Sequence, residues 1–197
     1  MVNMQVEWEI EQRRKWAHRR QLGIPNNRQL MVVACMDERL PVDEALGIRL
    51  GDAHVFRNAG GLVTDDVIRS AMLTTNFFNT KEIIIVNHTE CGMMSALGGT
   101  LVKALSKDHD LEKVHINPAL PELKIENQKA NFEKWIGMFA DVDKTCQQQI
   151  ELLRSSPLIP EHVIITGYIW QVESMTLRKP FARLYEKVNT NKDTGAK

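Results

Sequence analysis

Four short apolar runs, separated by segments with helical periodicity, limit the fold of this chain more than any other feature of its sequence. The runs are LMVVAC (30–35), AHVFRNA (53–59), EIIIVNH (82–88) and HVIITGYIW (162–170). Strands that are apolar on both faces are typical of parallel sheets covered by helices on both sides. We therefore predict an α/β fold with a mostly parallel central sheet flanked by helices.

The segments around these runs carry the helical patterns. Helices are expected at 4–21, 41–47, 64–78, 91–106 and about 127–154. In the last of these, apolar residues recur every three or four positions and include Cys146, which predicts a packed and inert thiol. The stretch HINPALPELKIEN (115–127) is typical of a proline-broken loop.

The length and charge of the chain indicate a single domain that does not bind nucleic acid. A chain of 197 residues suits one domain (1–197), with residues 1–23 as a helical arm and 189–197 as a disordered tail. The 25 basic and 25 acidic residues leave no basic excess for nucleic acid. No apolar run reaches the roughly 18 to 20 residues that span a membrane, and the charged N-terminus is unlike a signal peptide. Three cysteines cannot all pair, so we expect a reduced cytoplasmic protein.

Two cysteines and a histidine occur where predicted strands end. Cys35 ends the first strand, His88 ends the third, and Cys91 opens the helix expected next. The carboxyl ends of parallel strands share one edge, where such folds bind ligands. Two thiolates and an imidazole suit zinc, and three protein ligands leave the open position of a catalytic site. The alternatives are a redox pair of Cys35 and Cys91, which lacks the Cys-x-x-Cys spacing, and simple packing of these side chains.

Asp37 and Arg39 follow the first cysteine closely. An arginine can hold a carboxylate in a fixed bidentate pose. A carboxylate held there could accept a hydrogen bond from a zinc-bound hydroxide, or swing onto the metal as a fourth ligand. The alternative is a surface ion pair of little energetic value. Glu38 alternates to the other side and is expected to be solvated.

Three motifs, CMDER (35–39), RNAGG (57–61) and HTECG (88–92), occur in an order that resembles the β-class carbonic anhydrases. The resemblance implies that Cys35, His88 and Cys91 bind one zinc ion per subunit and that Asp37 and Arg39 form the catalytic dyad. It also implies that the glycines of RNAGG bring backbone close to the metal. A homodimer or a multiple of dimers, with the N-terminal helix on the neighbour, is a further implication.

Other stretches resemble the carbon disulfide hydrolase branch of that family: IPNN (24–27), TTNFFNTKEI (74–83), SPLIP (156–160) and the segment that begins ITGYIWQVES and ends LRKP (165–180). This narrower resemblance implies that a zinc-bound hydroxide hydrolyses carbon disulfide and carbonyl sulfide to hydrogen sulfide and carbon dioxide. The alternatives are a carbonic anhydrase acting on carbon dioxide and bicarbonate, and a non-catalytic zinc-binding protein of the same fold.

Substrate choice among small linear molecules would then depend on access to the metal. A narrow apolar tunnel would admit carbon disulfide and exclude bicarbonate. Phe77, Phe78, Met93 and Met94 are candidates to line it, although core packing is the favoured interpretation for each alone. His54 is expected to be buried in its strand or paired with a neighbour.

Overall fold

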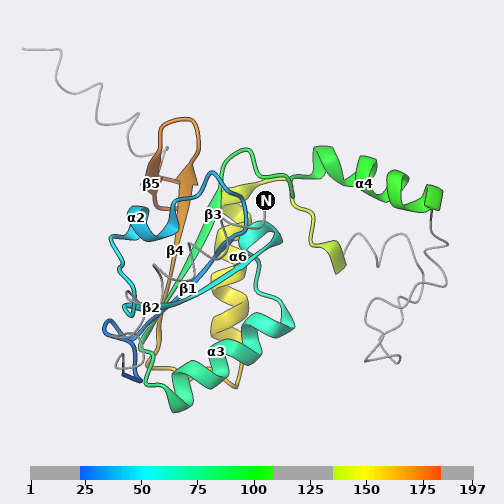
Figure 1. Ribbon diagram of the computed structural model, residues 1–197. Coiled ribbons are helices and arrows are strands. Elements are labelled where there is room, and N and C mark those ends of the chain that lie inside the picture. The colour runs from blue at the N-terminus through cyan, green and yellow to red at the C-terminus, as the bar shows by residue number, and fades with distance from the viewer. Residues whose placement is uncertain (1–22, 109–134, 183–197) are drawn as a thin grey trace, which may run out of the picture.

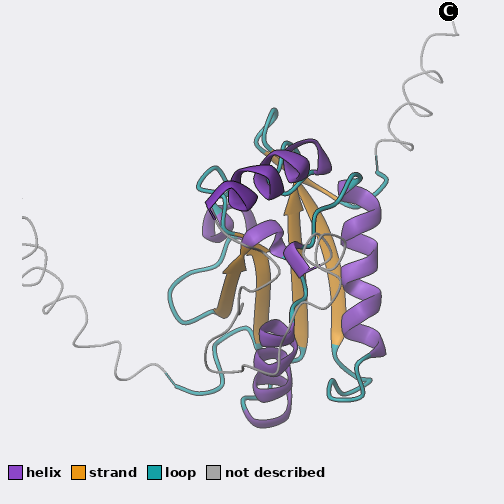
Figure 2. Cartoon of the chain, turned by 90° about the vertical axis from the view of Figure 1, so that its right-hand side faces the viewer, coloured by secondary structure: helices purple, strands orange, loops and turns teal. Residues whose placement is uncertain are grey.

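The computed structural model describes residues 23–108 and 135–182, which form a five-stranded sheet with helices on both faces (Figures 1 and 2). The strands are β1 (Leu30–Cys35), β2 (Ala53–Asn58), β3 (Glu82–His88), β4 (Ile164–Gln171) and β5 (Thr176–Arg178). Their order is β2-β1-β3-β4-β5. All neighbours are parallel except β4 and β5, which are antiparallel. The predicted α/β class and mostly parallel sheet are confirmed.

The predicted strands agree closely with the sheet. β1 and β3 have the predicted bounds, β2 ends one residue earlier than predicted, and β4 is shifted toward the C-terminus by one or two residues. β5 was not predicted, because three residues carry too little periodicity to be recognised. β1 is buried along its whole length, since alternate side chains enter the two separate hydrophobic clusters on opposite faces.

Helices cover both faces of the sheet. They are α2 (Val42–Leu46), α3 (Asp65–Phe77), α4 (Ser95–Asp108) and α6 (Val142–Ser155), together with the 3-10 turn η2 (Ala59–Gly61). α3 and α6 pack on the face that carries Met31 and Val33, and α2 packs on the face that carries Leu30 and Val32. α4 extends away from the carboxyl edge of the sheet (Figure 1).

The long helix predicted at 127–154 is wrong within the described residues. Its apolar spacing continues across a break, and α6 begins only at Val142. Gly137 adopts φ +77°, outside the helical region, and the Asp141 carboxylate caps α6 by accepting two backbone N–H groups of the first turn. The break therefore follows from a glycine and a capping aspartate that the apolar pattern concealed.

The third cysteine lies deep in the core, as predicted. Cys146 is fully buried, and a Cβ atom added at Gly167 of β4 would lie only 2.5 Å from its Sγ. Burial raises the pKa of this thiol to about 12. Cys146 is therefore a packing residue held against β4, away from the other two cysteines.

His54 and Phe78 meet at the amino end of the sheet. The His54 ring is partly buried, and its centroid lies 6.1 Å from that of Phe78. His54 pairs in register with Met31, near the start of β1. Of the two alternatives expected for His54, the contact with a neighbour is confirmed, while the ring is only partly buried.

Three predictions concern residues that the structure does not describe: the helix at 4–21 in the N-terminal arm, the loop at 115–127 and the tail at 189–197. Across the described ranges, every helix is too short or too polar to cross a membrane.

Candidate metal centre

The ends of two neighbouring strands bring a cysteine and a histidine together. Cys35 is the last residue of β1, His88 is the last residue of β3, and these strands are parallel neighbours. Cys91 follows in the turn after β3. The prediction that Cys91 opens a helix is wrong, because α4 begins only at Ser95. The turn still returns the chain to the strand ends, so all three side chains gather at one edge of the sheet.

The three side chains form a closely spaced donor cluster. One ligand atom from each of Cys35, His88 and Cys91 lies within 4.8 Å of the others, and the two sulfur atoms are 3.9 Å apart. All three residues are buried. A cluster of two sulfur donors and one nitrogen donor at this spacing has the composition of a three-ligand metal site.

The histidine presents a nitrogen without a partner to this cluster. His88 Nδ1 lies 2.8 Å from the backbone oxygen of Thr89, so the proton belongs on Nδ1, which donates to that carbonyl. Nε2 is buried and has no hydrogen-bond partner among the described residues. A buried acceptor with no donor is unfavourable, and a bound metal ion would satisfy it. The site therefore fits a metal.

The two adjacent thiols are shifted in opposite directions. The hydrogen bond with Cys91, together with nearby His88, lowers the pKa of Cys35. The same interaction raises the pKa of Cys91, since removing its proton would leave two adjacent thiolates. A divalent cation would remove that penalty by stabilising both thiolates.

The predicted pair of Asp37 and Arg39 forms beside this cluster. Arg39 donates from Nε to Asp37 Oδ1 at 3.0 Å and from an Nη to Oδ2 at 2.9 Å, in bidentate geometry. This guanidinium holds the pKa of Asp37 at about 2. Asp37 Oδ2 also lies 3.8 Å from His88 Nε2. The carboxylate is therefore ionised at neutral pH and lies beside the cluster, while Glu38 is exposed, as predicted.

The RNAGG turn packs against the backbone of β1 and β3 next to the donor cluster. Gly61 has φ +62°, and a Cβ atom there would lie 2.8 Å from the backbone nitrogen of Cys35 and 2.9 Å from the oxygen of Val86. Only glycine allows both the positive φ and this approach. The buried amide of Asn87 donates to the carbonyls of Gly60 and Gly61 at 2.7 and 3.2 Å. Gly61 therefore approaches the backbone of Cys35 closely, whereas Gly60 faces the side chains of Leu62 and Met93.

Sequence reasoning missed three supporting residues. Besides Asn87, Arg57 donates to the backbone oxygens of Cys35 and Asp37 at 2.9 and 2.6 Å and so holds the loop between them. Glu90 contacts Arg39 from the turn after β3. Each residue lies inside or beside a recognised motif, and that position was the available signal. Their partners are distant in sequence, so no local pattern revealed the contacts.

The candidate tunnel residues separate into two groups. Met93 and Met94 are partly buried and pack against the hydrophobic cluster that contains Cys35 and Cys91. Phe77 and Phe78 lie at the opposite end of the sheet, because α3 runs back from the carboxyl edge to the start of β3. The idea that Phe77 and Phe78 line a route to the site within one chain is therefore wrong. Phe77 is also not a core residue, since it is 73% exposed.

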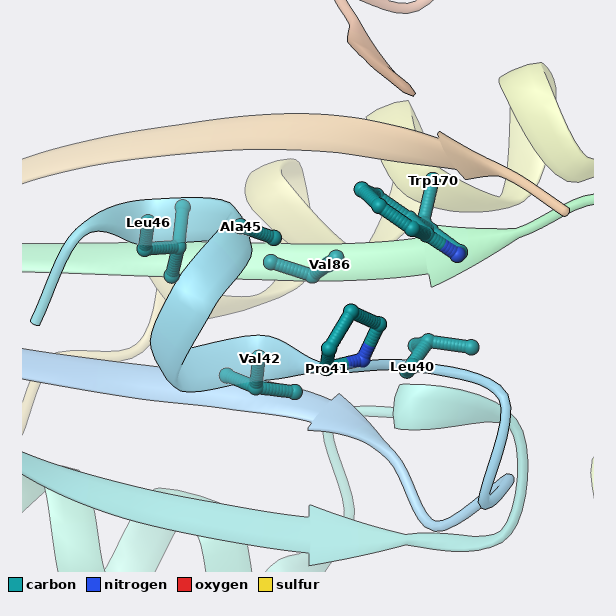
Figure 3. Close-up of a pocket in the computed structure, with 7 residues that line it drawn as sticks. All are labelled: Leu40, Pro41, Val42, Ala45, Leu46, Val86 and Trp170. Carbon is teal, nitrogen blue, oxygen red and sulfur yellow. The ribbon is translucent and has the colours of Figure 1, made fainter. Parts of the chain in front are cut away.

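An apolar pocket lies beneath α2 (Figure 3). Its lining residues are Leu40, Pro41, Val42, Ala45, Leu46, Val86 and Trp170. Val86 lies two residues before His88 on the same side of β3, and Trp170 pairs with His88 in register. The donor cluster therefore has an apolar surface on the side facing α2.

A mostly parallel sheet with a Cys–His–Cys donor cluster at its carboxyl edge and an ionised carboxylate beside it defines an α/β protein whose side chains could hold a metal ion. Residues 30–176 match the family described as carbonic anhydrase, and the chain belongs to that family. The β-class resemblance inferred from the three motifs is thereby confirmed.

Within the family, the chain is 61% identical to a carbon disulfide hydrolase from Acidithiobacillus thiooxidans over 199 residues, covering 100% of this chain and 99% of that protein. An apo structure of a carbon disulfide hydrolase, in selenomethionine form, superposes with a TM-score of 0.79 at 44% identity, covering 100% of this chain and 98% of the other. A carbonic anhydrase from Streptococcus mutans gives a TM-score of 0.63 at 32% identity, covering 88% and 96%.

Proposed function

We propose that this chain is a zinc-dependent hydrolase of carbon disulfide and carbonyl sulfide. The observation that carries the proposal is the full-length similarity to a carbon disulfide hydrolase at 61% identity, together with a donor cluster and an Asp–Arg pair in working geometry. Similarity to a carbonic anhydrase is lower in both identity and structural overlap. Hydrolysis of carbon disulfide is therefore favoured over hydration of carbon dioxide.

Cys35, His88 and Cys91 would hold the zinc ion. When bound, zinc supplies the Lewis acidity that makes water nucleophilic near neutral pH. The hydrogen bond from His88 Nδ1–H to the Thr89 carbonyl fixes the ring and leaves Nε2 available as the nitrogen that would bind the metal. Three protein ligands leave one position open for the reaction.

Asp37 would orient the attacking water. Its carboxylate can only accept hydrogen bonds, because its pKa of about 2 keeps it ionised throughout the neutral range. Arg39 fixes the plane of that carboxylate through two parallel hydrogen bonds. An oriented acceptor would direct one proton of the water away from the substrate and an oxygen lone pair toward it.

The reaction would proceed in two hydrolytic rounds. Water adds to the central carbon of carbon disulfide, a C–S bond breaks, and hydrogen sulfide leaves with carbonyl sulfide as the other product. A second water adds to carbonyl sulfide and releases carbon dioxide and another hydrogen sulfide. The apolar surface beneath α2 suits a substrate without charge.

Two alternatives differ in substrate or in catalysis. A carbonic anhydrase would use the same residues on carbon dioxide. A non-catalytic zinc-binding protein would need neither Asp37 nor Arg39, so the formed pair argues against it.

We also propose that the working unit is a homodimer or a multiple of dimers. Met36 directly follows Cys35 and is 64% exposed in the described part of the chain. A large apolar side chain left in water beside the site supports cover by a second copy. Location in the cytoplasm stays a prediction.

The test is a parallel assay of carbon disulfide, carbonyl sulfide and carbon dioxide on one zinc-loaded preparation. We expect rapid release of hydrogen sulfide from the first two and slow hydration of the third. Rapid carbon dioxide hydration without sulfide release would replace the proposal with carbonic anhydrase, and no turnover of any substrate would favour the non-catalytic alternative.

A further inference from the structure

Arg39 links two loops that are distant in sequence. Four of its five N–H donors are used: two bind the Asp37 carboxylate, one binds Glu90 Oε2 at 3.2 Å and one binds the backbone oxygen of Glu90 at 3.1 Å. Asp37 lies two positions from Arg39, whereas Glu90 lies 51 positions away, directly before Cys91. The guanidinium thus joins the loop after β1 to the turn after β3.

Arg57 anchors the backbone of the loop that carries Asp37, whereas Glu90 is the contact that anchors the Arg39 guanidinium itself. The hydrogen bonds between Asp37 and Arg39 lie within that one short loop, so they do not fix the guanidinium relative to the turn after β3. Glu90 holds the far side of the guanidinium through both its side chain and its backbone. Because Cys91 is the next residue, this contact sets the orientation of the pair relative to the donor cluster.

The backbone at Glu90 supports a function for its side chain. Glu90 adopts φ +56°, in the left-handed region that glycine occupies readily and residues with a Cβ occupy rarely. A glycine would relax this turn, yet the position carries a glutamate that reaches Arg39. Strained positions of this kind concentrate at functional sites.

Stability alone does not explain the contact. The side chains of Arg39 and Glu90 are 41% and 63% exposed. Ion pairs this exposed contribute little to the free energy of folding, because water screens them. What the contact does supply is direction, because it fixes a guanidinium that is already bidentate to Asp37.

We propose that Glu90 is a positioning residue that acts through Arg39 to hold the Asp37 carboxylate in register with the donor cluster. The expected effect of Glu90 on kcat rests on the proposed function, in which Asp37 orients the attacking water. The claim that Glu90 holds the Arg39 guanidinium in place does not depend on that function and is tested separately.

The kinetic test compares Glu90→Gly, Glu90→Gln and Glu38→Gln. Glu90→Gly removes the side chain and relaxes the backbone, so a side chain without a positioning role predicts unchanged or higher stability with full activity. We expect kcat for carbon disulfide to fall about 10-fold or more with KM nearly unchanged, at wild-type zinc content. Glu90→Gln keeps an acceptor oxygen and should recover most of the loss. Glu38→Gln removes the same charge from a neighbouring position and should leave kcat unchanged.

A double-mutant comparison tests the route through Arg39. If Glu90 acts through the guanidinium, Glu90→Gly should lower kcat in the wild type but not further in an Arg39→Lys background. Equal losses in both backgrounds would overturn the proposal, since Glu90 would then act independently of Arg39.

A measurement without turnover separates this inference from the proposed function. The Nε–H group of Arg39, assigned by its loss in Arg39→Lys, is observed by NMR in full-length protein with and without zinc. We expect slow exchange with water in the wild type and faster exchange in Glu90→Gly. Unchanged exchange would overturn the proposal, as would faster exchange with unchanged kcat. If the wild type releases no sulfide, the proposed function fails while exchange still decides whether Glu90 holds Arg39.

Discussion

Oδ2 of Asp37 lies 3.8 Å from Nε2 of His88, the buried nitrogen that has no hydrogen-bond partner among the described residues. The Asp37 carboxylate is at the same time bidentate to Arg39. An ionised hydrogen-bond acceptor is therefore held close to the nitrogen proposed to bind the metal. Asp37 is not one of the three proposed ligands, so its role can be tested separately from metal binding.

Asp37→Asn should lower kcat for carbon disulfide by about 100-fold or more, because loss of a positioned acceptor typically removes that much rate. Zinc content should stay at the wild-type level, since three other side chains supply the ligands. Sulfide release and metal analysis on the same samples measure both. Glu38→Gln is the matched control. An Asp37→Asn protein with full activity would remove Asp37 from the mechanism.

Zinc content should depend on two of the three cysteines. Purified wild-type protein should hold about one zinc ion per chain, and Cys35→Ser and Cys91→Ser should lose most of it. Cys146→Ala should keep it, because Cys146 packs against Gly167 instead of joining the cluster. Metal analysis after dialysis checks this. Equal zinc in all three variants would place the metal elsewhere.

Gly47 and Gly61 have similar positive φ angles but different surroundings, so alanine at each position distinguishes the cost of backbone strain from the cost of steric overlap. Gly47 has φ +58° with open space around it, whereas Gly61 has φ +62° and contacts the backbone of Cys35. Gly47→Ala should lower the free energy of unfolding by about 1–2 kcal/mol. Gly61→Ala should lower it by a further 1–3 kcal/mol or so, through overpacking, and should weaken zinc binding. Urea unfolding measures both, and equal losses would contradict the proposed close approach.

The Asp141 cap provides a test of where α6 begins. The Asp141 carboxylate accepts from the backbone nitrogens of Asp143 and Lys144 at 3.0 and 3.1 Å. Asp141→Ala should therefore cost about 1 kcal/mol and lower Tm by about 2–4 °C. Asp141→Ser, which retains a capping oxygen, should recover most of that loss. No change in Tm for the alanine variant would indicate a helix that continues through this position.

His54 should make stability depend on pH. Burial lowers its pKa in the folded state, so below about pH 6.5 the unfolded chain binds more protons. The stability that His54 contributes is complete above that pH and is lost as the pH falls toward its folded-state pKa. Tm should therefore drop more between pH 8 and pH 5.5 in the wild type than in His54→Asn. The exposed His162→Asn should follow the wild type, and parallel curves for all three proteins would contradict this account.

The sequence predicted β1 and β3 to the residue because both strands are apolar runs that end in a side chain of the donor cluster, Cys35 or His88. The same property predicts that Cys35 and His88 lie at one edge of the sheet. Parallel strands have a common direction, so their final residues must be neighbours once the strands are adjacent. The donor cluster was therefore predictable from strand ends and motif spacing.

The parts that escaped prediction depend on contacts between distant residues or on competing local signals. The apolar spacing of Trp135, Ile136 and Phe139 continues into α6, although Gly137 and Asp141 end one segment and begin the next. The contact between Arg39 and Glu90 joins residues 51 positions apart, so no periodic pattern in the sequence indicates it. Such contacts form only once β1 and β3 pair in the sheet, because this pairing brings the loops that follow them together.

The most direct test of the central claim is zinc titration of metal-free protein with sulfide release from carbon disulfide as the readout. We predict that release rises in proportion to added zinc and levels off at about one ion per chain. The Cys91→Ser protein should stay inactive over the same range. Sulfide release that is independent of zinc, or zinc bound at one per chain without sulfide release, would contradict the assignment of this cluster as the centre of a carbon disulfide hydrolase.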